Sequence, residues 1–195
     1  MRLTETTPAT ELSVALAQLR LHLRLPEGFG ADTAEDTLLS QYIAAATQRV
    51  ERLTGLALVS RPFRYNVERY DACEGIVLPI GPVETIDAFG LHGASGVLLI
   101  MDGADLSLSQ GETGQRVTLA GGRALPTIPE GAFARVAFTA GFGTAADVPA
   151  DLVQAVLLLA AAFYEGRAPA DETALPAEVA GLLASRRPAR LTVGA

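Results

Sequence analysis

The stretch FTAGFGTAADVPADLVQAVLLLAAAFYEGR, Phe138 to Arg167, decides how the whole chain is interpreted. Its glycine-containing part, GFGTAA, is compatible with a nucleotide-binding loop, and its apolar part with the beginning of a membrane span. A third interpretation is a strand, a glycine turn and a helix buried in a protein core, with the charged end of the helix facing a partner.

The apolar part is too short for a membrane span. It runs from Ala155 to Tyr164, with Asp151 before it and Glu165 after it. A span needs about 20 apolar residues. The run therefore predicts a helix buried in the core, in which Leu158→Asp would bury an unpaired charge.

Composition sets outer limits on the function. The chain has 195 residues, 49% of them hydrophobic, which is ample for a packed core. Its net charge of -7 argues against a large basic face that grips nucleic acid. The single cysteine, Cys73, excludes an internal disulfide and fits a reducing compartment. The N-terminus, MRLTETTPATEL, lacks the basic and then apolar layout of a signal peptide.

Apolar residues recur at helical spacing near the N-terminus. Residues 9–28 predict a first helix, with one face formed by Leu12, Leu16, Leu19 and Leu23. Residues 31–58 predict a second helix, ended near Gly55, whose apolar stripe is Leu39, Ile43, Ala46, Val50 and Leu53. Near the C-terminus, a third helix is predicted to end at about Tyr164, and residues 175–188 predict a short last helix.

The middle of the chain has a different period. In RPFRYNVERY, residues 61–70, apolar and polar residues alternate as in a strand, and glycine-punctuated β-forming runs follow as far as about residue 140. No segment long enough for a helical crossover separates these runs, so the strands are expected to be antiparallel. The prediction is an α+β fold: a mainly helical core of about four helices, with an antiparallel β insertion between the second and third long helices. The expected parts are residues 1–59, 60–143, 144–185 and a basic tail, 186–195.

Few residues point to enzyme chemistry. A dinucleotide loop at Gly141 and Gly143 would need a parallel β-α-β unit, which the pattern lacks, so a simple glycine turn is favoured over a nucleotide-binding module. The acidic residues Asp102, Asp105 and Glu112 leave a hydrolase as a third hypothesis, although they do not have the spacing of a calcium loop. Neither histidine has a second metal ligand at the usual spacing. We therefore expect no catalytic residues, no cofactor and no metal.

Several short motifs occur in an order that resembles a known family. They are His22-Leu23-Arg24, AAATQRVERLTGLAL, LPIGPVETI, TAGFG, VPADLVQAVLLLAAAFYEGR and LPAEVAGLLASRR. In this order they resemble the head–tail connector (adaptor) proteins of long-tailed phages, prophages and gene-transfer-agent particles. The likeness covers about residues 15–187. The strand region, residues 60–143, is longer than the compact members of the family need, and residues 90–122 within it are expected to form an enlarged β extension.

The resemblance implies a non-enzymatic structural protein in the neck of a phage-like virion, assembled in the host cytoplasm. It implies a homo-oligomeric ring, commonly dodecameric, bound below the portal protein, with a tail-side neck protein (a stopper or tail terminator) as its other partner. DNA would pass through the ring without sequence-specific binding, and no membrane would be involved. A net negative charge fits this role, because attraction to phosphates would slow a sliding duplex.

The candidate portal-interface residues lie at two places. The resemblance points to the end of the third helix and to the C-terminal segment. The tail, residues 186–195, also carries three arginines and no acidic residue. Because Pro188 prevents the helix from continuing, this tail is expected to be a movable end that docks onto a partner. The candidates are Tyr164, Glu165, Arg167, Arg186, Arg187 and Arg190.

Overall fold

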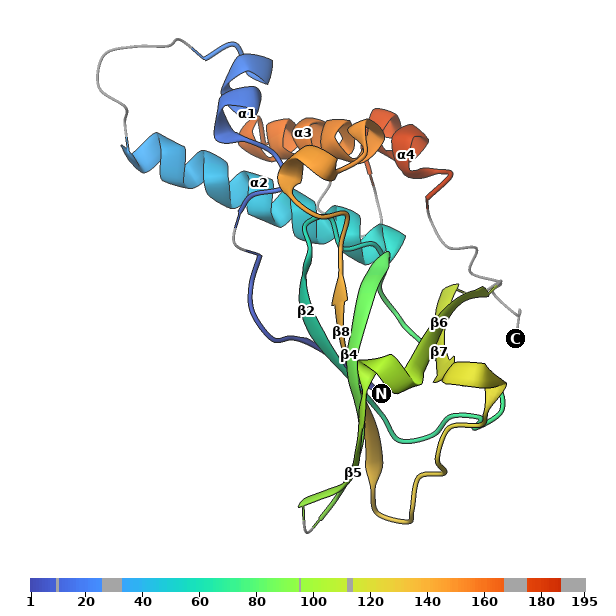
Figure 1. The fold of residues 1–195 in the computed structure, drawn as a ribbon. Helices are drawn as coiled ribbons and strands as arrows, with labels where there is room; N and C mark the ends of the chain where they lie inside the picture. Colours follow the sequence, from blue (N-terminus) through green and yellow to red (C-terminus); the bar gives the residue numbers. More distant parts are fainter. Residues whose placement is uncertain (10, 26–32, 95, 112–113, 167–174, 187–195) are drawn as a thin grey trace, which may run out of the picture. The chain divides into compact units, whose positions relative to one another are not determined.

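The computed structural model describes residues 1–9, 11–25, 33–94, 96–111, 114–166 and 175–186. The chain forms two compact units (Figure 1). The first, the β unit, comprises Met1–Ala9 and Ser60–Gly141. The second, the helical unit, comprises Thr10–Val59 and Phe142–Ala195. Across these described ranges, four α-helices and the antiparallel sheets confirm the predicted α+β class.

The helical unit is built around α3 (Ala150–Tyr164), which contacts α1 (Leu16–His22), α2 (Thr33–Thr54) and α4 (Ala177–Leu183) (Figure 1). Because α3 has neighbours on several sides, it can bury apolar residues around most of its circumference. Its buried residues are Leu152, Ala155, Val156, Leu157, Leu159, Ala160 and Ala161. This confirms the core helix predicted from the apolar run. Leu158, however, is only partly buried, so the position chosen from the sequence as a core site was wrong.

The apolar stripe predicted for α2 is confirmed, since Leu39, Ile43, Ala46 and Val50 are fully buried. Gly55 follows the helix with a φ of 68°, a conformation that glycine adopts without strain. A side-chain oxygen of Glu51 then accepts a 2.8 Å hydrogen bond from the N–H of Leu58. The motif VERLTGLAL therefore ends the helix, and its glutamate accepts a hydrogen bond from the backbone that follows.

The first helix is shorter than its sequence pattern predicted. Residues 9–28 were expected to be helical, yet α1 begins only at Leu16, after Ala15 with an extended backbone. The hydroxyl groups of Ser13 and Thr47 lie 2.6 Å apart, which joins the residues before α1 to α2. Tertiary packing thus holds Ser13 and the buried Val14 outside the helix, although the apolar spacing is helical.

The β unit contains a five-stranded sheet in the order β1-β2-β8-β4-β5, with every pair antiparallel. The strands are β1 (Arg2–Glu5), β2 (Arg61–Val67), β4 (Val83–Gly93), β5 (Gly96–Asp102) and β8 (Phe133–Ala140). A second sheet has the order β3-β7-β6, with β3 (Ile76–Val77), β6 (Leu106–Gly111) and β7 (Gly114–Leu119). The antiparallel strands are as expected, but β1 was not predicted from the sequence.

Alternation along the strands gives the five-stranded sheet two different faces. One face is apolar, with a row of paired residues comprising Leu3, Tyr65, Val136, Phe89 and Met101. On this face the rings of Phe63 and Phe138 stack with centroids 5.7 Å apart. The row on the other face is Arg2, Asn66, Arg135, Gly90 and Ile100. The register therefore carries most of the buried residues of this sheet, including Arg61 over the ring of Phe63, on one side, while Arg2 and Arg135 lie on the other.

Candidate interaction surfaces

The C-terminal end of α3 presents two of the candidate portal-interface residues. Tyr164 is exposed and is the last residue of the helix; its ring meets that of Tyr42 edge to face, with the ring centroids 6.3 Å apart. Glu165 is the exposed C-cap, and its N–H donates to the carbonyl of Ala161. Packing against Tyr42 thus orients Tyr164 while leaving its edge accessible. Arg167 lies outside the described residues.

A groove of about 490 Å³ lies beside this helix end. Its apolar lining includes Leu23, Leu158, Ala161 and Ala162, which explains why Leu158 is not fully enclosed. The charged residues lining it are Arg24, Glu165 and Glu178. The groove can therefore take up apolar side chains of a partner segment and offers charges of both signs beside them.

This groove brings together motifs that are distant in the sequence. His22, Leu23 and Arg24 come from the end of α1, while Glu165 follows α3. Sequence reasoning had selected Glu165 but had not selected Arg24 as an interface residue. The sequence signal for Arg24 is the His22-Leu23-Arg24 motif, one of the motifs that carry the family resemblance.

The C-terminal candidates are only partly described. Arg186 follows α4, and its Nε donates a 3.0 Å hydrogen bond to Oδ2 of Asp151 in the first turn of α3. Arg187 and Arg190 lie outside the described residues. The structure thus gives Arg186 an acidic partner within its own unit, and its contact with a portal stays a prediction.

The Gly141 and Gly143 turn is filled by its own chain. A Cβ atom on Gly141 would lie 2.3 Å from the Cα atom of Ser60, and one on Gly143 would lie 2.7 Å from Oδ2 of Asp147. The same Asp147 carboxylate accepts hydrogen bonds from the N–H (2.9 Å) and hydroxyl (2.7 Å) of Thr144. These bonds lower the pKa of Asp147. An anionic carboxylate therefore occupies donors that a nucleotide phosphate would need.

The acidic residues of the β unit do not converge on a common centre. Asp102 accepts a hydrogen bond from the N–H of Ala104 and so caps the short 3₁₀ helix Gly103–Asp105. Glu112 lies outside the described residues. His92 stacks on Phe133, and its pKa is lowered by burial and by Arg135. Within the described part of the chain, no group of three His, Cys, Asp or Glu residues could hold a metal ion.

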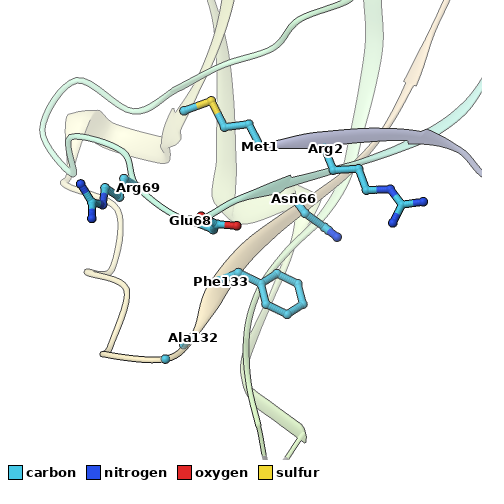
Figure 2. Close-up of a pocket in the computed structure, with 8 residues that line it drawn as sticks. Met1, Arg2, Asn66, Glu68, Arg69, Ala132 and Phe133 are labelled. Atoms are coloured by element: carbon cyan, nitrogen blue, oxygen red, sulfur yellow. The ribbon is translucent and has the colours of Figure 1, made fainter.

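The β unit also carries a hollow of about 550 Å³ along β1, β2 and the start of β8. Its lining includes Arg2, Asn66, Glu68, Arg69 and Phe133. The side chains of Arg2 and Arg69 lie at opposite ends of it and point away from one another (Figure 2). They therefore do not form a clamp for a single anion, and Glu68 lies between them.

None of the helices in the described ranges has the length and apolar character needed to cross a bilayer. A comparison with family models and one with curated proteins gave no match. Solved structures do match along the full length. A chain from the neck of an empty gene transfer agent (GTA) particle, computed with C6 symmetry, has a TM-score of 0.83 and 37% identity. The match covers 100% of this chain and 99% of that one.

Two further structures agree with this match. A chain from the virion of a native gene transfer agent particle has a TM-score of 0.81 and 37% identity, and covers the two chains to 100% and 99%. A chain from the neck of a native particle, computed with C12 symmetry, has a TM-score of 0.80 and 34% identity with the same coverage. With this level of identity over the entire length, the similarity between the chains extends to their sequences as well as to their folds. The protein therefore belongs to the head–tail connector (adaptor) family found in the necks of gene transfer agent particles.

Proposed function

We propose that this chain is the structural adaptor of a phage-like or gene-transfer-agent-like particle. In this role it forms a ring in the neck, between the portal and the tail. The observation that carries the proposal is the 37% identity, over the full length, with a chain of a gene transfer agent neck. The proposal assigns no catalytic residues to the protein, and the crowded Gly141–Gly143 turn removes the main support for a nucleotide-binding alternative.

A symmetric ring is the form of assembly that we propose. The related necks were computed with C6 and C12 symmetry, which supports several copies of this chain arranged about one axis. Twelve copies fit both symmetries, since a twelve-fold ring also contains the six-fold axis. The net charge of -7 supports a central channel through which DNA slides without being held.

The portal is the proposed partner of the helical unit. The end of α3 offers the exposed Tyr164 and Glu165 beside the groove, and these groups suit a protein partner because they combine apolar surface with charge. The basic residues Arg187 and Arg190 are proposed to add charge-assisted hydrogen bonds to acidic groups or carbonyls of the portal. A tail-side neck protein is the proposed partner on the other side of the ring.

Particle assembly tests this function directly. In a producing strain that lacks the gene, we expect DNA-filled heads without attached tails, and restoration of complete particles by the wild-type gene. Mass spectrometry of purified necks should find about one copy of this chain for each portal subunit. Normal particles from the deleted strain, or particles that never contain this chain, would refute the proposal.

A further inference from the structure

The β5 strand exposes four consecutive large apolar side chains. Val97, Leu98, Leu99 and Ile100 are 54%, 54%, 38% and 67% exposed. Because side chains alternate along a strand, these residues place apolar surface on both sides of the sheet. Within the described residues β5 pairs only with β4, so its other edge is open. Figure 1 shows the hairpin of β4 and β5 at the lower end of the five-stranded sheet.

An open apolar edge of this kind makes a free protein prone to aggregation. Backbone groups along it can pair with any other strand, and natural edge strands are usually short or protected by lysine or proline. β5 has seven residues, GVLLIMD, and contains neither lysine nor proline. This composition indicates a strand that is covered in the assembled state.

The opposite edge of the same sheet is β1, whose four residues are all exposed. The N–H of Thr6 donates to the carbonyl of Pro62, which identifies the side of the chain that faces β2. Since hydrogen-bonded and non-hydrogen-bonded pairs alternate in an antiparallel ladder, the backbone N–H and C=O of Leu3 and Glu5 point to the open edge. β1 thus presents free backbone partners, and Leu3 adds apolar surface there.

The direction of the two edges follows from the topology. Every neighbouring pair in the five-stranded sheet is antiparallel, and with five strands the first and last run in the same direction. If a second copy continues the sheet, its β1 therefore lies parallel to β5 of the first copy. Each copy has one edge of each kind, so the contact is head-to-tail, which is the type of interface that closes a cyclic ring.

We propose that β5 of one copy pairs with β1 of the next copy, and that this parallel edge contact links the subunits of the ring. The inference rests on the proposed ring function and adds the surface through which neighbouring subunits of the ring contact one another. Continuing the sheet in level register places Leu3 of the next copy beside Met101, and its Arg2 beside Ile100. In this register Met1 of the next copy lies beside Leu99, whereas a two-residue shift places its Leu3 beside Leu99 and its Met1 beside Val97.

Charge supports the same pairing. Arg2 is exposed at the β1 edge, and Asp102 is exposed at the end of β5. Asp102 lies two residues beyond Ile100, on the same face of the sheet. A long arginine side chain can reach such a diagonal neighbour across two strands.

Cysteine cross-linking in assembled particles tests the contact. In a Cys73→Ser background, Leu3→Cys is combined with Met101→Cys or, for a two-residue shift, with Leu99→Cys. Adjacent parallel strands lie about 4.8 Å apart, which is within the Cα separation that a disulfide spans. We expect mild oxidation to give a ladder of covalent multimers reaching the ring size. Each single-cysteine variant should give no ladder.

A second set of variants distinguishes specific edge pairing from non-specific hydrophobic association. Arg2→Glu and Asp102→Arg should each reduce incorporation into particles severalfold, and the double variant should restore it. Leu3→Pro removes the outward N–H and should block incorporation, while Leu3→Ala should weaken it less. Circular dichroism of each purified variant checks that it is folded.

The outcomes distinguish this inference from the proposed function. If particles contain the double-cysteine proteins but neither pair gives a ladder, and the charge reversal does not rescue incorporation, the ring is built by another surface and the edge contact is refuted. If β5 instead cross-links to a tail-side protein, the apolar strand binds that partner and the inference is also refuted. If particles never contain the wild-type chain, the proposed function itself fails.

Discussion

Nε of Arg186 donates to Oδ2 of Asp151 at 3.0 Å, and a second bond, from Nη2 to Oδ1, measures 3.3 Å. This ion pair joins the turn after α4 to the first turn of α3. An aspartate in a first helical turn is also favoured by the helix dipole. Arg186, assigned from the sequence to a portal-docking tail, thus has a structural role inside its unit.

The pair should contribute little but measurably to stability. Both side chains are about one third exposed, so solvent screens the attraction. In a double-mutant cycle with Arg186→Ala and Asp151→Ala, we expect a coupling of about 0.2–1 kcal/mol. Urea unfolding at low and high salt measures it, and the coupling should shrink at high salt. A coupling of zero at both salt concentrations would show that the contact does not persist in solution.

Portal binding should depend on the residues after Arg186. Deleting residues 187–195 should leave a folded protein with weak portal binding, because it removes Arg187 and Arg190 but keeps the Arg186–Asp151 pair. Deleting residues 186–195 should add only a small loss of stability. Binding of the full chain to portal rings should weaken with salt, since exposed charges are screened over about 10 Å at 0.1 M. Equal binding by truncated and full-length protein would assign the contact to other surfaces.

Neighbouring leucines on α3 should respond very differently to a charge. Leu159 is fully buried, whereas Leu158 lines the groove. Leu159→Asp should destabilise the protein by several kcal/mol, because it buries an unpaired carboxylate. Leu158→Asp should cost far less and should reduce portal binding if the groove is the contact. Thermal melting of both variants checks this, and similar melting temperatures would contradict the assigned burial.

Two glycines with positive φ distinguish the cost of backbone strain from the cost of a steric clash with an added Cβ atom. Gly141 has a φ of 149° and no space for a Cβ beside Ser60, while Gly131 has a φ of 75° and nothing within 4 Å. Gly131→Ala should cost about 1–2 kcal/mol, from backbone strain alone. Gly141→Ala should cost clearly more, because the backbone near Ser60 must also move. Denaturant unfolding compares them, and an equal loss would mean that the collision is relieved at no cost.

Asp147 should make the stability of the protein depend on pH in the acidic range. Its pKa is lowered by the hydrogen bonds from Thr144, so folding favours its ionised form. That contribution is present above about pH 4 and is lost as the pH falls through the lowered pKa of the folded state. Asp147→Asn should therefore flatten the stability profile between about pH 5 and pH 2. Melting curves over this range test it; parallel profiles for both proteins would exclude a role for this carboxylate.

Much of the fold was predictable because its signals are local. The apolar run of α3, the stripe of α2 and the alternation in β2 each reflect the period of one element packed on one core. The order of short motifs likewise indicated the family. By contrast, the segment before α1 has a helical pattern but is not helical, because Ser13 contacts Thr47 from a distant part of the chain.

The interaction surfaces, in contrast, depend on contacts between distant residues. The sequence by itself determined that the chain has a buried α3, an antiparallel β region and arginines near the C-terminus. Only the tertiary structure decided that Leu158 lines a groove with Arg24 and Glu165, and that Arg186 pairs with Asp151. It also decided that β5 is an open edge, since strand order results from pairing between segments that are far apart in the sequence. The hydrophobic pattern indicates which residues prefer burial. Which neighbours cover them depends on contacts between distant segments, and these contacts form only in the tertiary structure.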